Sequence, residues 1–223
     1  LCFWEQKYYE MGVVEDVVMI DTKQVAHPFV AYIKKAAKKV RFLQAGFTQN
    51  QLGSRLSKSK ANILVLSSAD KESATEILEQ VSLYKKNNPQ YDIRLIGYPE
   101  WLDYSSFLAD KMYMLETYVF TPFYNNTFSQ RNLNFVNQYT GLFKKKMDAT
   151  RPVMAMFGFD CGYFMLKALA RYGRDYAGQD VYAAPLQNAF SFKPFGSSGG
   201  MVNQYVQFVH YRKDRQIELI KLK

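Results

Sequence analysis

Short apolar runs alternate with amphipathic segments across the first half of the chain, and this alternation restricts the fold more than any other feature. The runs expected to form strands are residues 13–20, 63–66, 93–96 and 117–121. Because these runs are apolar on both faces, they are typical of a parallel sheet that is covered on both sides. The segments between the first three runs are long enough for right-handed crossovers. The pattern therefore predicts a doubly wound α/β unit.

Helical periodicity marks the connecting segments. A helix with lysines on its outer face is expected from His27-Pro28, with its apolar face formed by Phe29, Ile33, Ala36, Ala37 and Val40. A short helix is expected around Leu52 and Leu56. Asp70 is the expected N-cap of a longer helix, whose apolar side chains recur at Ala74, Ile77, Leu78, Val81 and Tyr84.

The second half has a different order of elements. Helices are expected over residues 132–147 and 153–172 with no strand between them, and Gly173 is the expected end of the second helix. An alternating segment follows at residues 190–194. Residues 205–211 and 216–222 are expected to pair as a β-hairpin.

The chain is basic, with 29 Lys and Arg against 20 Asp and Glu and a formal net charge of +9. We expect no nucleic-acid partner, because there is neither an Arg-rich arm nor a Gly-rich phosphate loop. The charge indicates a solvated basic surface, or attraction to an anionic wall or membrane surface. No apolar run approaches the roughly 20 residues that cross a bilayer. The opening residues 1–5 have neither the basic start nor the apolar stretch of a signal peptide.

Catalytic and metal-binding patterns are not found in the sequence. His27 and His210 have no nearby ligand partners in sequence, and both are expected to be structural. Cys2 and Cys161 give no metal spacing; a disulfide between them stays open, and Cys161 is expected in the core. There is no Gly-x-Ser-x-Gly elbow, and Asp21 lacks the acidic neighbours of a phospho-acceptor site. We therefore expect no enzyme, no catalytic residue, no metal and no cofactor.

The stretch Gly97-Tyr98-Pro99-Glu100-Trp101 follows the apolar run at residues 93–96 and ends in a turn. A carboxylate, an aromatic ring and a stiff backbone thus come together at the carboxyl end of an expected parallel strand, where ligands bind in open α/β sheets. The sequence predicts a ligand-binding cleft at this point. An alternative stays open, in which Glu100 caps the next segment and Trp101 is a core residue.

Three stretches together resemble the type I periplasmic solute-binding proteins of the branched-chain amino-acid receptor type. Residues 95–101 resemble the strand and GPEG loop of that family's second lobe, and residues 157–173 resemble its YDA-containing helix. The third stretch resembles the closing strands of that family and comprises Phe192, Gly199-Gly200, Asn203-Gln204 and residues 206–211. Residues 98–101 and the Gly-Gly-x-x-Asn ending are similar to a Bacteroidetes subgroup often joined to peptidoglycan-binding LysM repeats. The resemblance covers residues 13–212.

The resemblance implies a periplasmic-binding-protein type I fold with one complete lobe and part of a second, without the family's opening βα units. Residues 13–118 would build the second lobe, and residues 119–190 a hinge strand and the helices of the incomplete first lobe. Residues 191–223 would supply strands that return to the second lobe. The helix at 153–172 would then expose an apolar face, through which a homodimer is expected.

The resemblance also implies a function. It indicates a non-enzymatic solute-binding module of the ABC-transporter or sensory type, periplasmic or associated with the cell envelope, that binds an amino acid or similar small polar ligand between its lobes. Glu100 would meet the ligand's ammonium group and Trp101 would stack on a ring or cation. The full set of implied ligand-binding residues is Asp21, Thr22, Ser67, Ser68, Glu100, Trp101 and Tyr104. The alternative is an envelope scaffold on the same fold, tied to peptidoglycan through a further domain, without solute binding.

Overall fold

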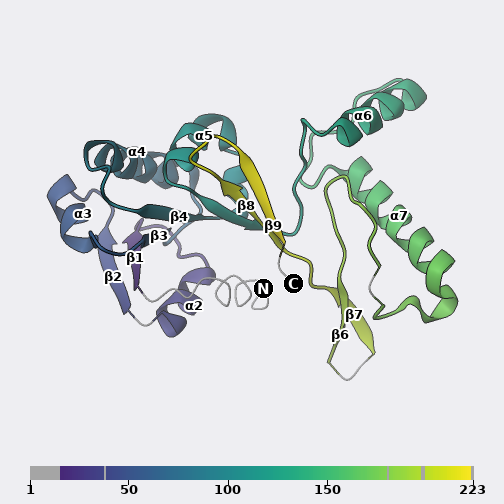
Figure 1. The fold of residues 1–223 in the computed structure, drawn as a ribbon, viewed down its shortest axis with the longest axis horizontal. Helices are drawn as coiled ribbons and strands as arrows, with labels where there is room; N and C mark the ends of the chain where they lie inside the picture. Colours follow the sequence, from purple (N-terminus) through teal and green to yellow (C-terminus); the bar gives the residue numbers. More distant parts are fainter. Residues whose placement is uncertain (1–15, 38, 180, 197–198, 222–223) are drawn as a thin grey trace. The chain divides into compact units, whose positions relative to one another are not determined.

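The computed structural model describes residues 16–37, 39–179, 181–196 and 199–221, which divide into two compact units (Figure 1). Unit 1 contains the described residues of Leu1–Phe120 and Phe208–Lys223. Unit 2 contains those of Thr121–Gln207. The chain therefore leaves unit 1 after Phe120 and returns to it at Phe208, so that unit 1 is built from two separate segments.

Unit 1 is built on a seven-stranded sheet with the order β2-β1-β3-β4-β5-β8-β9. The first five strands in this order pair in parallel. The amide of Tyr211, at the end of β8, donates to the carbonyl of Thr117 at 2.8 Å, so the end of β8 lies beside the start of β5. The strands are β1 (Asp16–Asp21), β2 (Lys39–Gln44), β3 (Asn62–Leu66), β4 (Ile93–Gly97), β5 (Tyr118–Thr121), β8 (Gln207–Tyr211) and β9 (Ile217–Lys221).

Helices cover both faces of this sheet, as the doubly wound pattern predicts. In Figure 1, α4 and α5 lie on one side of the strands of unit 1 and α2 lies on the other. The side chain of Asp70 accepts from the amide of Ser73 at 2.8 Å and caps α4, and the expected apolar residues of that helix are buried. The helices of unit 1 are α2 (Phe29–Ala36), α3 (Gln49–Arg55), α4 (Lys71–Asn87), the 3-10 helix η1 (Pro99–Leu102) and α5 (Ser105–Met114).

The core of unit 1 is centred on β1, β3 and β4. Adjacent residues, which point to opposite faces, are both buried: Val18 and Met19 on β1 and Leu64 and Val65 on β3 are at most 1% exposed. This burial confirms that the central strands are apolar on both faces because both faces are covered. The expected strand residues 13–15 lie outside the described residues.

Strand β2 corrects one expectation. The helix that was expected to continue through Val40 ends at Ala36, and Lys39–Gln44 forms an edge strand. Each of its six residues is in register with one residue of β1. Because an edge strand is largely exposed, it carries lysine and arginine in place of the continuous apolar run that marks a buried strand.

The described residues of unit 2 form two α-helices, a 3-10 turn and a small antiparallel hairpin. Rings of Phe164, Phe190 and Phe192 pack around Ala168 and Val181 to form its apolar cluster. The elements are α6 (Gln130–Phe143), α7 (Met154–Tyr172), η2 (Gly173–Tyr176), β6 (Phe192–Phe195) and β7 (Gly200–Asn203). The two helices without a strand between them were expected.

A buried carboxylate ties α7 to the loop that follows it in unit 2. Asp160 is 2% exposed, and its two oxygens accept from the amides of Leu186, Gln187 and Asn188 at 2.7, 3.0 and 2.8 Å. The side chain of Asn132 on α6 donates to the carbonyl of Leu186 at 3.0 Å. This loop is therefore the point where the two helices of unit 2 are joined.

The hairpin of unit 2 corrects the expected return of residues 191–223 to the larger unit. Strands β6 and β7 pair with each other in a separate sheet and belong to unit 2. Only β8 and β9 join the large sheet, where they are neighbours as the expected hairpin requires. Gly199, which precedes β7, has a φ of +73°, a backbone conformation that residues with side chains rarely adopt, so glycine suits this position.

Candidate functional site

Three strands of the parallel sheet end at one edge of unit 1. Strand β3 pairs in parallel with both β1 and β4, so the segments that follow these strands leave the sheet at the same end. In open α/β sheets, ligands bind at this carboxyl edge. Every ligand-binding residue expected from the sequence lies at or after the end of one of the three strands: Asp21, Thr22, Ser67, Ser68, Glu100, Trp101 and Tyr104.

Hydrogen bonds join Asp21, Thr22 and Ser67 directly. The hydroxyl of Ser67 accepts from the amide of Thr22 at 2.9 Å and lies 3.2 Å from the hydroxyl of Thr22. It also donates to Oδ1 of Asp21 at 3.3 Å. Thr22 and Ser67 are buried, whereas Asp21 is partly exposed. The ends of β1 and β3 thus present one connected polar cluster.

The Asp21 carboxylate is kept ionised by its neighbours. The backbone amide of Lys23 donates to Oδ1 at 3.0 Å, and the side chain of Gln44 donates to Oδ2 at 3.2 Å. The Lys23 amide does most to lower the pKa of Asp21, with help from Gln44 and Ser67 and against a smaller effect of burial. A negative charge therefore remains at the end of β1 at neutral pH and favours cationic groups.

Ser68 has a different set of contacts from Ser67. Its side chain is buried, and its hydroxyl accepts from the amide of Asp70 at 3.1 Å. Because Asp70 itself caps α4, Ser68 belongs to the turn that begins this helix. The structure therefore does not connect Ser68 to the cluster of Asp21, Thr22 and Ser67 by any hydrogen bond between described side chains.

Two aromatic side chains fasten the Glu100 turn to the end of β3. The hydroxyl of Tyr98 donates to the carbonyl of Leu66 at 2.5 Å, and the indole NH of Trp101 donates to the carbonyl of Ala69 at 3.2 Å. Leu66 and Ala69 flank Ser67 and Ser68 on either side. Tyr98 and Trp101 have no exposed surface, whereas Glu100 between them is exposed. The turn is therefore rigid, and its carboxylate faces solvent.

Trp101 and Tyr104, both expected to bind the ligand, differ in their exposure. Trp101 packs against Tyr98 at 5.8 Å between ring centroids and leaves no surface for a ligand to stack on. Its place in this structure matches the alternative that treats it as a core residue. Tyr104 is partly exposed, and Nζ of Lys71 lies 5.7 Å from its ring centroid. Tyr104 therefore stays within reach of the carboxyl edge.

His27 is a residue that the sequence did not assign to the site. Its amide donates to the carbonyl of Ser67 at 2.7 Å, and its ring lies 4.4 Å from the ring of Tyr98. Partial burial lowers the pKa of His27, and the negative charge of Glu100 opposes this effect. His27 precedes Pro28 at a helix start, and this sequence signal predicts only a structural role.

The remaining histidine and cysteine positions give no reactive centre. His210 is buried in β8, where it stacks on Tyr118 at 3.9 Å and lies 3.3 Å from Glu218. Cys161 is a free thiol that is partly exposed, contrary to its expected place in the core, and burial raises its pKa. Cys2 lies outside the described residues. Among the described residues, no three His, Cys, Asp or Glu side chains gather as metal ligands.

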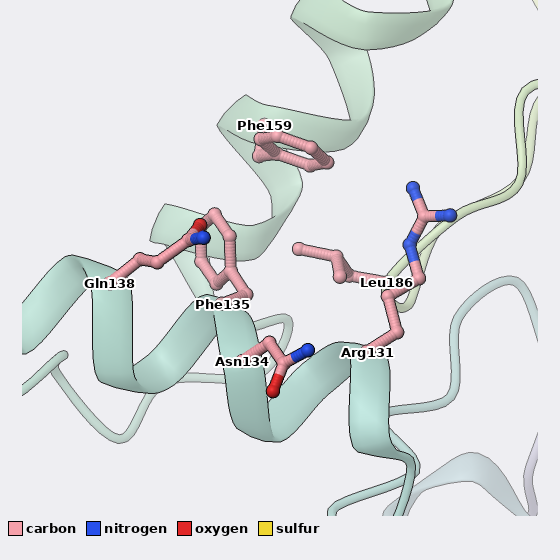
Figure 2. Close-up of a pocket in the computed structure, with 6 residues that line it drawn as sticks. All are labelled: Arg131, Asn134, Phe135, Gln138, Phe159 and Leu186. Carbon is pink, nitrogen blue, oxygen red and sulfur yellow. The ribbon is translucent and has the colours of Figure 1, made fainter.

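Unit 2 has a separate hollow of about 500 Å³ that none of the expected site residues lines. Figure 2 shows side chains from α6 at its floor, with Phe159 of α7 and Leu186 facing them. The rings of Phe135 and Phe159 are 5.0 Å apart. The lining is Arg131, Asn134, Phe135, Gln138, Phe159 and Leu186.

Solved structures share the fold of this chain at low sequence identity. A Desulfitobacterium hafniense ABC transporter substrate-binding protein in complex with Leu is 14% identical with a TM-score of 0.53, over 98% of this chain and 64% of that protein. Another structure of an ABC transporter substrate-binding protein from that organism is 13% identical with a TM-score of 0.51. The match covers 97% of this chain and 65% of that protein. A Rhodospirillum rubrum protein described as a branched-chain amino acid ABC transporter is 14% identical with a TM-score of 0.53. The match covers 97% of this chain and 64% of that protein. No protein-family model and no curated protein matches the chain.

These comparisons establish the class of fold. The chain has the mixed α/β architecture of type I periplasmic-binding proteins, with a mostly parallel central sheet. It spans 64–65% of the length of these neighbours, which fits one lobe and part of a second. No helix in the described ranges is long and apolar enough to cross a bilayer.

Proposed function

We propose that the chain is a solute-binding module that binds an amino acid or a similar small polar solute at the carboxyl edge of unit 1. One observation carries the proposal: the hydroxyls of Thr22 and Ser67, the carboxylate of Asp21 and the exposed carboxylate of Glu100 lie at one edge of the sheet. The leucine-bound neighbour described above supports an amino acid as the ligand class.

The chemistry of each group follows from its surroundings. Glu100 is exposed on a turn fixed by two buried rings, so the backbone that carries its carboxylate is already in place to receive a ligand ammonium group. The hydroxyl of Thr22, at the same edge of the sheet, offers a neutral donor or acceptor. Trp101 positions the turn and Tyr104 borders it. No role in this proposal requires bond making or breaking, so the module is not an enzyme.

The proposal extends to an extracytoplasmic protein that serves transport or sensing. Its support is the fold shared with ABC transporter substrate-binding proteins. Peptidoglycan association through a further domain remains a prediction from the sequence resemblance. The exposed Glu100 carboxylate supports solute binding over a scaffold without it.

Titration of the ¹⁵N-labelled chain with L-leucine, followed by NMR, tests the proposal. We expect amide shifts at Thr22, Ser67 and the non-proline residues of 98–104. We also expect a loss of affinity of about 10- to 100-fold in Glu100→Gln, since a charge-assisted hydrogen bond is removed. Glu76→Gln, an exposed carboxylate of α4, is the matched control. Leucine shifts that are absent, or that occur only outside this edge, would contradict the proposed site.

A further inference from the structure

His27 is held in a fixed place at the carboxyl edge by its backbone. It lies in the loop between β1 and α2, and its amide donates to the carbonyl of Ser67 at 2.7 Å. Ser67 belongs to the polar cluster at the end of β3. The loop that carries His27 is therefore attached to the same residue that joins Asp21 and Thr22.

The hydrogen bond of its ring defines the tautomer of His27. Nδ1 accepts from the amide of Phe29 at 3.2 Å, in the first turn of α2. A nitrogen that accepts an N–H cannot carry a proton, so in the neutral ring the proton sits on Nε2. Partial burial, which lowers the pKa of His27 despite the negative charge of Glu100, favours this neutral form at neutral pH.

The orientation of the ring leaves that proton available. One side of the imidazole packs on Tyr98, whose own ring is fully buried and bonded to Leu66. The His27 side chain is nevertheless partly exposed, and no described residue accepts a hydrogen bond from its Nε2. The Nε2–H of His27 is therefore a donor on a partly exposed side chain, where a bound ligand can reach it.

We propose that His27 is a ligand-binding residue of the unit 1 site, which donates Nε2–H to an acceptor oxygen of the solute bound beside Glu100. The inference rests on the proposed function and deepens it. A carboxylate that receives an ammonium group and an N–H that meets an oxygen together match a solute carrying both groups, such as an α-amino acid. Tyr98 supports the ring but cannot compete for the ligand, since its hydroxyl is already bonded to Leu66.

Three variants separate the donor from the ring. His27→Phe keeps an aromatic ring against Tyr98 and removes the donor, and we expect L-leucine binding to weaken about three- to tenfold, the value of one neutral hydrogen bond. His27→Gln restores a side-chain N–H, and we expect part of the affinity to return. Val25→Ser, an exposed change in the same loop, is the control and should bind L-leucine as the unaltered chain does.

NMR of the imidazole nitrogens tests the proposal without relying on affinity. We expect His27 to carry its proton on Nε2 before ligand is added, and its Nε2 signal to shift with L-leucine, with His210 as the internal reference. A proton on Nδ1, or equal affinity in His27→Phe and the unaltered chain, would overturn the inference while leaving the proposed function intact. If neither Ser67 nor residues 98–104 respond to L-leucine, the proposed function fails, and the inference fails with it.

Discussion

At the scale of single residues, Gly97 is required because Trp101 occupies the space next to it. A Cβ at this position would lie 2.7 Å from Cε3 of Trp101 and 2.9 Å from Cγ2 of Val119, both fully buried. We expect Gly97→Ala to lower the free energy of unfolding by about 1–3 kcal/mol through overpacking, measured by urea unfolding followed by tryptophan fluorescence.

Gly158→Ala is the matched control for this change. Gly158 lies within α7 and has no atom within 4 Å of an added Cβ, so alanine there should leave stability unchanged or raise it. Equal stability of Gly97→Ala and the unaltered chain would contradict the close packing of Trp101 and Val119 against Gly97.

His27 also makes stability depend on pH. Its folded-state pKa is lowered from 6.5, chiefly by burial, so the unfolded chain takes up the proton first as the pH falls. The contribution is therefore present above about pH 6.5 and is lost below it. Because the ring is half-buried, we expect the loss to stay below about 1 kcal/mol after solvent screening.

Urea unfolding at about pH 7.5 and about pH 5.5 measures this effect. The drop in unfolding free energy between these two values should be smaller in His27→Phe than in the unaltered chain. An identical drop in the two proteins would mean that His27 has the same pKa in the folded and unfolded states.

At the scale of elements, Asp160 holds unit 2 together through α7. Its carboxylate satisfies three successive amides of residues 186–188 in a buried place, and no other acceptor for them is present among the described residues. We expect Asp160→Ala to lower the free energy of unfolding by about 3–5 kcal/mol, because buried donors are left without partners. Asp148→Ala, an exposed carboxylate, should have little effect.

Hydrogen exchange locates the effect of this change. The amides of Leu186, Gln187 and Asn188 should exchange much faster in Asp160→Ala than in the unaltered chain. The amides of β3 in unit 1 should still exchange only through global unfolding in both proteins. Unchanged protection of residues 186–188 would contradict the role assigned to the carboxylate.

The elements differ in how far the sequence predicted them. The central strands and α4 were predicted closely, because both signals, a continuous apolar run and a capped helix with regular apolar spacing, arise from local residues and burial. Strand β2 was missed, because its residues are largely exposed and it becomes a strand only through its pairing with β1. The hairpin of β6 and β7 was assigned to the wrong unit, since partner choice depends on contacts distant in sequence.

The candidate site was predicted in part for the same reason. The family resemblance implied Asp21, Thr22 and Ser67 as ligand-binding residues in the loops after successive strands, and hydrogen bonds join them in the structure. The burial of Trp101 depends on Gly97 and the end of β3, which no local pattern reveals. His27 enters the site through the carbonyl of Ser67, a contact between residues 40 positions apart.

At the scale of the whole molecule, unit 1 depends on a chain segment that arrives late. In its sheet β8 lies next to β5, although 85 residues lie between Thr121, the last residue of β5, and Gln207, the first residue of β8. Without β8, the backbone groups of β5 would form an exposed sheet edge, which favours association with other chains. Folding of unit 1 therefore requires a contact of high sequence separation, which is expected to be slow.

The exposed apolar side chains of α7 predict that the chain associates with a second copy of itself. Met154, Leu166 and Leu169 are 57%, 69% and 45% exposed, an unusual amount of apolar surface for one helix. The net charge of +9 opposes contact between two copies, and salt screens this repulsion. We therefore expect light scattering to show a homodimer whose population rises from low salt to about 0.5 M salt.

Substitution on α7 decides whether its apolar surface is responsible. Leu166→Ser removes a strongly exposed leucine and should shift the chain toward the monomer, because burial of this side chain is the driving force for association. Val25→Ser, which changes a 92% exposed apolar residue of unit 1, should leave the homodimer population unchanged. A monomer at every salt concentration would contradict the prediction. A dimer that persists in Leu166→Ser would place the contact elsewhere, since loss of apolar area must weaken any interface to which Leu166 belongs.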